Sequence, residues 1–371
     1  MFRLSRNNLA PSFVLAALVV AAQSSQGEDA IPDVAKPGVN GYLTSELIYP
    51  LDDKPTPQCH ASTLAELPDG TLVAAWFGGT HEKNPDVGIW FSRHAKGGWS
   101  KPVQLVDGSE GEDKEYACWN PVLFQPKKGP LLLFYKVGLD PRNWWGMLIT
   151  SDDGGKSWSQ PRKLGESEKL GEANTNLIGP VKNKPIQLSD GSILCPSSSE
   201  HDNWRVHFEL SKDLGKTWEV IGPIHDGTTI SAIQPSILTY ADGSMQILCR
   251  TRQNVVGQAW SKDGGKTWSN VTATDLPNPN AGTDAVTLAD GRQLLVYNHT
   301  TRSSKPAGRQ MLNVAISKDG KAWRPVLTLE RSSGEYSYPA VIQTSDGKVH
   351  IAYTYQRRSV KHVVLDPTKL P

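Results

Sequence analysis

The octapeptide SDDGGKSW at residues 151–158 recurs further along the chain as SKDLGKTW at 211–218 and SKDGGKTW at 261–268. A shortened copy, SKDGKAW, occupies 317–323, and a degraded copy without the aspartate, SRHAKGGW, occupies 92–99. The five copies start at positions 92, 151, 211, 261 and 317, so neighbouring starts are 50 to 60 residues apart. A fixed period of this length is typical of a repeat architecture.

The residue types in this box have a structural purpose. The aspartate can accept backbone N–H hydrogen bonds across a tight turn, and the glycine can adopt the positive φ that such a turn needs. The tryptophan can then cover apolar surface between strands. We therefore interpret the boxes as devices that fix hairpins, and we do not assign them a catalytic role.

A second pattern alternates with the boxes: a turn followed by an apolar strand. It occurs six times, at 68–77, 129–136, 189–197, 241–250, 289–298 and 345–354. Each unit has room for a four-stranded sheet, and such sheets pack radially in β-propellers. The sequence therefore predicts an all-β protein, a six-bladed β-propeller of four-stranded antiparallel blades. We expect the last blade to be closed by a segment near 43–49 that pairs with the C-terminal strand near 362–365, because closure protects exposed edges.

The N-terminus has the order of regions found in a secretory signal. Arg3 and Arg6 precede the apolar run FVLAALVVAA at 13–22, and small or polar residues follow up to Gly27. The run is too short to span a bilayer of roughly 30 Å as a helix. We expect a signal peptide at 1–27, a flexible leader at 28–40 and one propeller domain at 41–371. The protein is then secreted or periplasmic and has no membrane span.

Composition narrows the classes of partner. The chain has 371 residues, of which 21% are charged and 38% are hydrophobic, as is typical of a soluble globular protein. Its formal net charge of +1 gives no overall positive potential that would attract a nucleic acid. Cys59, Cys118, Cys195 and Cys249 are even in number, so they suit either disulfides or buried free thiols. No Cys/His spacing suggests zinc. We expect no metal, no cofactor and a monomer.

The boxes, their period and the six units resemble the Asp-box (BNR) repeats of the sialidase, or neuraminidase, superfamily over nearly the whole mature chain. This resemblance implies a sugar carboxylate held by three arginines, a tyrosine nucleophile assisted by a glutamate, and an aspartate as acid and base. Asp86 matches the aspartate, Arg250 matches the second arginine, and Tyr336 or Tyr338 matches the tyrosine. Arg302 or Arg309 could supply the third arginine.

Two positions depart from the sialidase pattern. The place of the first arginine reads CHAS at 59–62, so that His60 stands there, and the place of the assisting glutamate holds Gln234. The chain is therefore more similar to a divergent sialidase-like branch, some members of which look like lyases of rhamnosyl-glucuronate ends of plant polysaccharides.

In a propeller, polar residues near the ends of the inner strands converge on the axial mouth. We select as catalytic candidates His60, His81, Asp86 and Tyr336. We select as substrate-binding candidates Lys136, Arg142, Glu200, Arg205, Gln234, Arg250 and Asn298. Arginines bind carboxylates through two parallel hydrogen bonds, which suits an acidic oligosaccharide or polysaccharide. Histidines titrate near neutrality and can transfer protons.

These residues leave two reactions and one alternative open. Hydrolysis needs a nucleophile such as Tyr336 and an acid such as Asp86. Elimination from a uronate needs its carboxylate neutralised, a base for the C5 proton and an acid for the leaving oxygen. The absence of the assisting glutamate weakens the case for hydrolysis and does not affect elimination. We expect a secreted enzyme that cleaves a glycosidic bond at an acidic sugar from the chain end. The alternative is a non-catalytic glycan-binding propeller.

Overall fold

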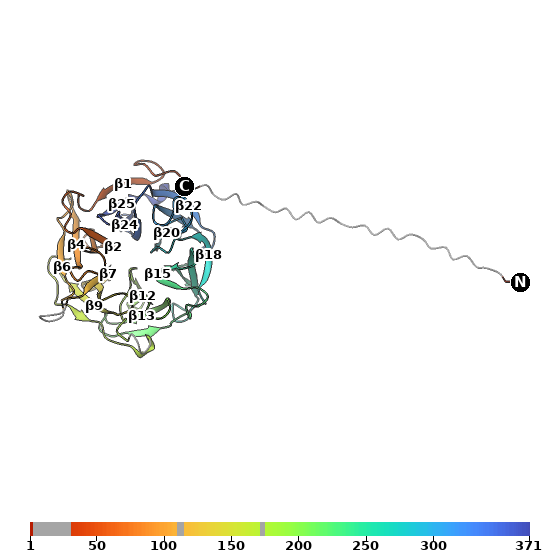
Figure 1. The fold of residues 1–371 in the computed structure, drawn as a ribbon, viewed down its shortest axis with the longest axis horizontal. Coiled ribbons are helices and arrows are strands. Elements are labelled where there is room, and N and C mark those ends of the chain that lie inside the picture. Colours follow the sequence, from red (N-terminus) through yellow and green to blue (C-terminus); the bar gives the residue numbers. More distant parts are fainter. Residues whose placement is uncertain (3–30, 110–114, 171–174) are drawn as a thin grey trace. The chain divides into compact units, whose positions relative to one another are not determined.

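The computed structural model describes residues 1–2, 31–109, 115–170 and 175–371. The expected signal peptide at 1–27 lies almost entirely outside these residues. Residues 31–371 form one compact unit in which six antiparallel sheets surround a central axis (Figure 1). The predicted six-bladed all-β propeller is therefore confirmed.

The first three blades run from the innermost strand outward. Blade 1 contains β2 (Gln58–Glu66), β3 (Leu72–Gly79), β4 (Gly88–Ala95) and β5 (Gly98–Trp99), and its additional strand β6 (Val103–Val106) also pairs with β4. Blade 2 contains β7 (Ala117–Phe124), β8 (Leu131–Gly138), β9 (Trp144–Ser151) and β10 (Arg162–Lys163). Blade 3 contains β11 (Ile186–Gln187), β12 (Ile193–Ser199), β13 (Arg205–Ser211) and β14 (Glu219–Ile221).

The remaining blades follow the same order. Blade 4 contains β15 (Ala232–Thr239), β16 (Met245–Thr251), β17 (Val255–Ser261) and β18 (Thr272–Pro277). Blade 5 contains β19 (Asp284–Thr287), β20 (Gln293–Tyr297), β21 (Met311–Ser317) and β22 (Arg324–Arg331). Blade 6 contains β23 (Tyr336–Gln343), β24 (Val349–Tyr355), β25 (Ser359–Leu365) and, as its outer strand, β1 (Tyr42–Leu47). Two short 3₁₀ helices, η1 (Glu168–Leu170) and η2 (Pro367–Lys369), lie between or after strands.

The ring closes as the sequence predicted. β1 pairs antiparallel with β25, with Glu46 opposite His362 and Tyr42 opposite Leu365. The first and last parts of the domain therefore share one sheet, and β1 covers the edge that β25 would otherwise expose. Part of the expected leader also contacts the propeller, because Val34 bridges to Thr328 of β22.

Each box lies in the turn between the third and fourth strands of its blade. In the first complete box, Asp153 Oδ1 accepts hydrogen bonds from the backbone N–H groups of Lys156 and Ser157, at 2.9 and 2.8 Å, and from the Ser151 hydroxyl. Gly155 adopts φ +83° and approaches the ring of Phe91 in the preceding blade so closely that a Cβ would clash. The boxes are thus structural, as their residue types predicted.

The box tryptophans pack against the preceding blade. The ring centroids are separated by 5.4 Å for Trp158 and Phe91, by 6.0 Å for Trp218 and Phe134, and by 4.4 Å for Trp268 and Phe208. Each pair joins two neighbouring sheets, so the repeated box also sets the contact between blades.

The four cysteines are buried free thiols, which resolves the alternative left by their even number. Among the residues that the structure describes, no helix is long and apolar enough to cross a bilayer.

Candidate active site

The innermost strands carry a repeated backbone irregularity at the axial mouth. In four of them a bulge interrupts the pairing with the second strand, and a residue other than glycine has positive φ there: Ala61, Asn120, Gln234 and Tyr338. In blades 3 and 5 a left-handed residue precedes the inner strand instead, namely Lys182 at φ +69° and Asn280 at φ +64°. Bulges re-aim side chains, and strained backbone concentrates at functional sites.

Tyr338 is the side chain on which these irregular segments converge. Its hydroxyl accepts a hydrogen bond from Arg250 Nη1 at 2.6 Å and lies 3.4 Å from Gln234 Nε2. The centroid of its ring lies 4.1 Å from that of His60 and 5.3 Å from the guanidinium carbon of Arg309. Blades 1, 4 and 5 therefore each bring at least one polar side chain to the phenol that blade 6 provides.

Arg250 carries a positive charge that the described residues leave without a carboxylate partner. Its Nε donates to Asn280 Oδ1 at 2.6 Å, and its Nη1 donates to Tyr338, so both of these acceptors are neutral. The guanidinium also lies 4.9 Å from the ring centroid of Trp204. A buried or half-buried arginine with neutral partners is suited to an anionic ligand.

Glu335 organises the other arginines of the mouth. Its carboxylate accepts from Arg309 Nη1 at 2.6 Å and from Arg357 Nε at 2.8 Å, and His60 Nε2 lies 3.8 Å away. Burial opposes ionisation of Glu335, but the neighbouring cationic groups outweigh it and hold its pKa far below the usual range. Glu335 is therefore ionised. Arg357 also donates to Glu82 at 2.7 Å, so its charge is neutralised within the protein.

His60 is buried and neutral. Only 2% of its surface is exposed, and its Nδ1 is hydrogen-bonded to Thr354 Oγ1 at 2.9 Å. Burial, and after it the charge of Arg357, lowers the pKa of His60 well below that of an ordinary histidine. At neutral pH the ring can therefore accept a proton but does not carry a positive charge.

The pKa values of Glu200 and Asp86 are shifted in opposite directions. Burial raises the pKa of Glu200, against the opposing charges of Arg250 and Arg252. Asp86 is exposed, and its Oδ2 accepts from the Thr80 backbone N–H at 2.9 Å and hydroxyl at 2.6 Å. Partial burial of Asp86 raises its pKa, but these hydrogen bonds have the larger combined effect. The pKa of Asp86 therefore lies below its ordinary value. Glu200 is thus better suited than Asp86 to hold a proton near neutral pH.

The structure brings together some of the candidates chosen from sequence. His60, Gln234 and Arg250 meet around Tyr338, and Glu200 lies within electrostatic reach of Arg250. Tyr336, by contrast, is buried, and its hydroxyl is hydrogen-bonded to Ser332 and Gln356.

The other candidates have partners of their own. Arg142 is exposed and paired with Asp140, and Arg205 is paired with Asp202. His81 is exposed, and its Nδ1 is hydrogen-bonded to the carbonyl of Glu82. Lys136 is fully buried and donates to the carbonyls of Leu177 and Ile178, while burial lowers its pKa to about 8. Asn298 is buried and donates to two backbone carbonyls.

Sequence reasoning missed Arg357 and Glu335 and did not choose Arg309 over Arg302. Arg357 lies in the turn between β24 and β25, where Gln356 and Arg357 both have positive φ without being Gly, Asn or Asp. The usual signal of such a turn is therefore missing. Glu335 directly precedes the segment YSYP at 336–339, which was a usable signal. Within the described residues, no group of His, Cys, Asp and Glu is arranged to hold a metal ion.

The chain matches the BNR repeat-like domain over residues 70–351. It is 26% identical to the anhydrosialidase of Macrobdella decora over 242 residues, which cover 60% of this chain and 31% of that protein. It is also 26% identical to a sialidase of Bacteroides fragilis over 260 residues, covering 62% of this chain and 44% of that protein. The matched region thus spans less than half the length of either relative.

Solved structures of similar fold include two sialidase-type proteins. The intramolecular trans-sialidase of Ruminococcus gnavus, solved with oseltamivir carboxylate, has a TM-score of 0.67 at 18% identity, covering 90% of this chain and 99% of that one. The Hadza microbial sialidase has a TM-score of 0.72 at 16% identity, covering 88% and 69%. At such identities the likeness concerns the fold. With the repeats, the six blades and the match to most of the propeller, the chain belongs to the BNR repeat-like family of the sialidase superfamily.

Proposed function

We propose that the protein is a sialidase-like glycosidase that acts on a terminal acidic sugar, with the sugar carboxylate bound by Arg250 and Arg309. The observation that carries this proposal is the state of Arg250, whose two hydrogen bonds go to neutral acceptors beside the hydroxyl of Tyr338. A ligand carboxylate would supply the missing negative charge next to a group capable of nucleophilic attack. The sialidases among the relatives support the same reaction class.

In the proposed reaction Tyr338 Oη attacks the anomeric carbon while the bond to the leaving oxygen breaks. Glu200, whose pKa is raised by burial, supplies the proton that the leaving oxygen takes up. The phenolic proton passes to neutral His60, whose ring packs on that of Tyr338. Water then attacks the anomeric carbon of the tyrosyl-sugar intermediate and gives a proton to the Glu200 carboxylate. The bond to the tyrosyl oxygen breaks, and that oxygen takes back its proton from His60, so that the sugar is released and the phenol is restored. The guanidinium of Arg250 stabilises negative charge on the phenolic oxygen.

Elimination from a uronate is a second candidate, and one observation favours it. The position at which sialidases are expected to have the assisting glutamate holds Gln234, whose amide lies beside the Tyr338 hydroxyl. An amide cannot act as a base. Elimination needs the carboxylate neutralised by arginine, a base such as His60 for the C5 proton and a proton donor for the leaving oxygen. Each of these is available without a carboxylate on Tyr338.

Two substrates separate the reactions. The protein is incubated with sialyl-lactose and with glucuronate glycans capped by rhamnose. Release of sialic acid supports hydrolysis, and ultraviolet absorbance of a new C4–C5 double bond supports elimination. Binding without any product supports the non-catalytic glycan-binding propeller instead. In that case His60→Ala and His81→Ala keep affinity because arginines and aromatic rings hold the sugar, whereas in an enzyme His60→Ala keeps binding and loses turnover.

We also propose that the protein is exported, on the order of charged, apolar and small residues at 1–27. Expression of the full chain with its own N-terminus, followed by mass measurement of the extracytoplasmic protein, tests this. Cleavage near residue 27 supports export, and retention of the intact chain in the cytoplasm contradicts it.

A further inference from the structure

A cavity of about 370 Å³ lies between blades 1 and 2, on strands outside the innermost strand β7. Its walls are formed by β6 and the following turn of blade 1 and by β8, β9 and the end of the first complete box of blade 2. Ligand pockets generally have volumes of roughly 300 to 1,000 Å³, so this cavity has the size for one small ring-shaped molecule.

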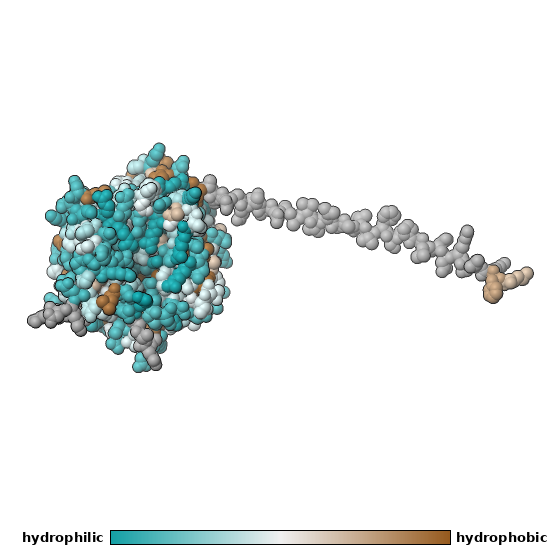
Figure 2. All heavy atoms as spheres, in the orientation of Figure 1, coloured by the Kyte–Doolittle hydropathy of each residue, from teal (hydrophilic) through white to brown (hydrophobic). Residues whose placement is uncertain are grey.

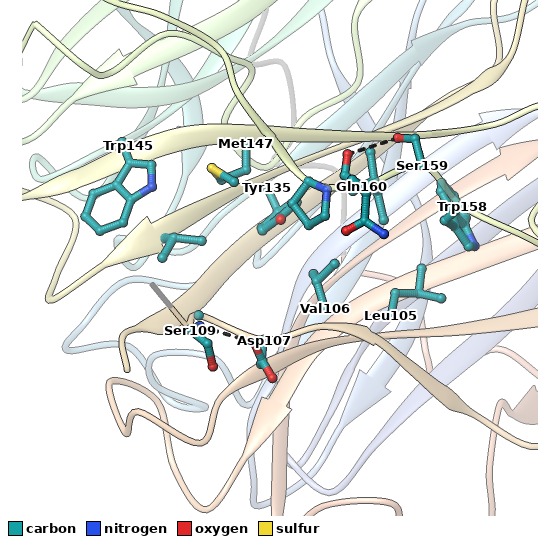
Figure 3. A pocket seen from close by; sticks show the side chains of 14 residues that line it. Leu105, Val106, Asp107, Ser109, Tyr135, Trp145, Met147, Trp158, Ser159 and Gln160 are labelled. Atoms are coloured by element: carbon teal, nitrogen blue, oxygen red, sulfur yellow. Dashed lines mark hydrogen bonds between the residues drawn. The ribbon is translucent and has the colours of Figure 1, made fainter. Parts of the chain in front are cut away.

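The position of β6 accounts for the cavity. Blade 1 does not end in a single outer strand, because β5 pairs with β4 at one end and β6 pairs with it at the other, with an irregular register. β6 therefore faces blade 2 across a space that side chains leave partly open, with Leu105 and Val106 on one side and Met147 on the other (Figure 3).

The lining is amphipathic. Trp145 lies at one end and Trp158 at the other, with Tyr135 between them (Figure 3). Tyr135 is 1% exposed and lines the cavity. Asp107 and Gln160 are exposed and offer a carboxylate and an amide. Aromatic faces with a few polar groups suit a ligand that has an apolar face and several hydroxyl groups.

The charge of the lining differs from that of the axial mouth. Asp107 is the one ionisable group other than tyrosine among the residues that line the cavity, and none of these is Lys, Arg or His. The mouth, in contrast, holds Arg250, Arg309 and Arg357. The nearest cation that the structure shows is Lys163, whose ammonium lies 4.8 Å from the ring centroid of Trp145 and is not itself part of the lining. The lining therefore offers no cation of its own, and an uncharged ligand fits it.

We propose that this cavity is a second binding site that takes a neutral monosaccharide unit, separate from the mouth and independent of the reaction there. The apolar face of the sugar ring would pack on Trp145 and the neighbouring apolar wall, while Asp107 and Gln160 would accept or donate hydrogen bonds to its hydroxyl groups. A single small sugar binds with a Kd on the order of 1 mM.

The test is saturation-transfer NMR and calorimetry on the whole protein with the methyl glycosides of galactose, glucose, mannose and rhamnose. Trp145→Ala should weaken binding at least about tenfold. Trp260→Ala is the matched control, because Trp260 is a half-buried tryptophan on the third strand of blade 4. It should bind as the unaltered protein does, and so should Arg250→Ala, even if the protein proves to have no glycosidase activity.

Three results would overturn the proposal. These are no saturable binding of any of the four glycosides, binding that survives Trp145→Ala, and binding that Arg250→Ala abolishes, which would assign the sugar to the mouth. Thermal melting of each variant checks folding, and Asp107→Asn, an exposed substitution, gives a second reading if Trp145→Ala fails to fold. In that event unchanged affinity in Asp107→Asn counts against the site.

Discussion

In the proposed site, Arg250 is the residue on which we expect sugar binding to depend most. Its replacement by alanine removes a charge-assisted bond to the carboxylate, worth up to about 3 kcal/mol, so kcat/KM should fall by about 100-fold. Arg142→Ala is the control, because Arg142 is exposed and paired with Asp140. Steady-state kinetics on whichever acidic glycan is cleaved provides the measurement. Equal losses in both variants would contradict the assignment.

The two tyrosines of the segment YSYP are expected to behave differently. Tyr338→Phe removes the hydroxyl that Arg250 contacts and should abolish turnover while acidic sugars still bind. Tyr336→Phe removes buried hydrogen bonds to Ser332 and Gln356, so it should lower the melting temperature by a few degrees and leave turnover within about tenfold. The reverse pattern would show that Tyr336 is the reacting group.

This choice between tyrosines shows why the site was only partly predictable. Residues two apart on a regular strand point to the same face, so sequence alternation cannot separate Tyr336 from Tyr338. The bulge between Ser337 and Ala340, with φ +53° at Tyr338, gives the two rings different surroundings. His60, Gln234 and Arg250 could be predicted because the turn and strand signals in the sequence placed them at the ends of inner strands. The turn that presents Arg357 lacks the residues that mark it.

At the scale of the element, the box aspartate should stabilise its hairpin. Asp153→Ala removes an acceptor of several hydrogen bonds and should lower the melting temperature by several degrees. Asp152→Ala, its exposed neighbour, should have little effect. Differential scanning calorimetry compares the two. A similar melting temperature for both variants would contradict the structural role of the box.

The same hydrogen bonds make the boxes sensitive to acid. In the box at 261–268, the corresponding aspartate is Asp263. Hydrogen bonds from the hydroxyl and the backbone N–H of Thr267 are the main cause that lowers the pKa of Asp263 to about 2. A carboxyl with a depressed folded-state pKa contributes stability that is complete above the ordinary aspartate pKa of about 4 and is lost as the pH falls towards 2. Asp263→Ala should therefore lower the melting temperature at pH 6 and change it little at pH 2.

At the scale of the whole molecule, the seam that closes the ring carries a histidine cluster. His350 and His362 are hydrogen-bonded to each other at 2.9 Å, and His94 and His362 both contact Glu46 of β1. Burial, then the charge of His362, lowers the pKa of His350 to about 4. Burial also lowers the pKa of His362, although Glu46 opposes it. His350 and His362 are therefore neutral imidazoles in the folded protein at neutral pH.

The seam should open as the pH falls. A histidine whose folded-state pKa is depressed binds protons more readily when unfolded, so stability is lost between the ordinary pKa of about 6.5 and about 4. The melting temperature should drop steeply over this window, and His350→Gln should make the drop shallower. Hydrogen bonds lower the pKa of Asp346 beside His350 and that of Glu46, so the comparison is made at pH 7 and pH 5, above the range in which these carboxylates take up protons. An equal loss in both proteins would contradict this account.

The fold as a whole was predictable because the same sequence pattern occurs in each of the six blades. Six turn-and-strand signals gave six blades, and β3, β8, β12, β16, β20 and β24 begin within two residues of those turns. The pairing of β1 with β25 followed from the need to protect an edge. The additional strand β6, which opens the cavity between blades 1 and 2, has no such repeated signal.

Hydrophilic residues surround the propeller axis on the face seen in Figure 2, in keeping with a polar ligand near the axis. The most direct measurement is a crystal structure of the protein soaked with glucuronic acid and, separately, with sialic acid. We predict that the carboxylate of one of them lies within hydrogen-bonding distance of the Arg250 guanidinium, with the sugar ring beside Tyr338 and His60. A carboxylate bound elsewhere, or a mouth in which Arg250, Arg309 and Tyr338 do not share one hollow, would contradict the account.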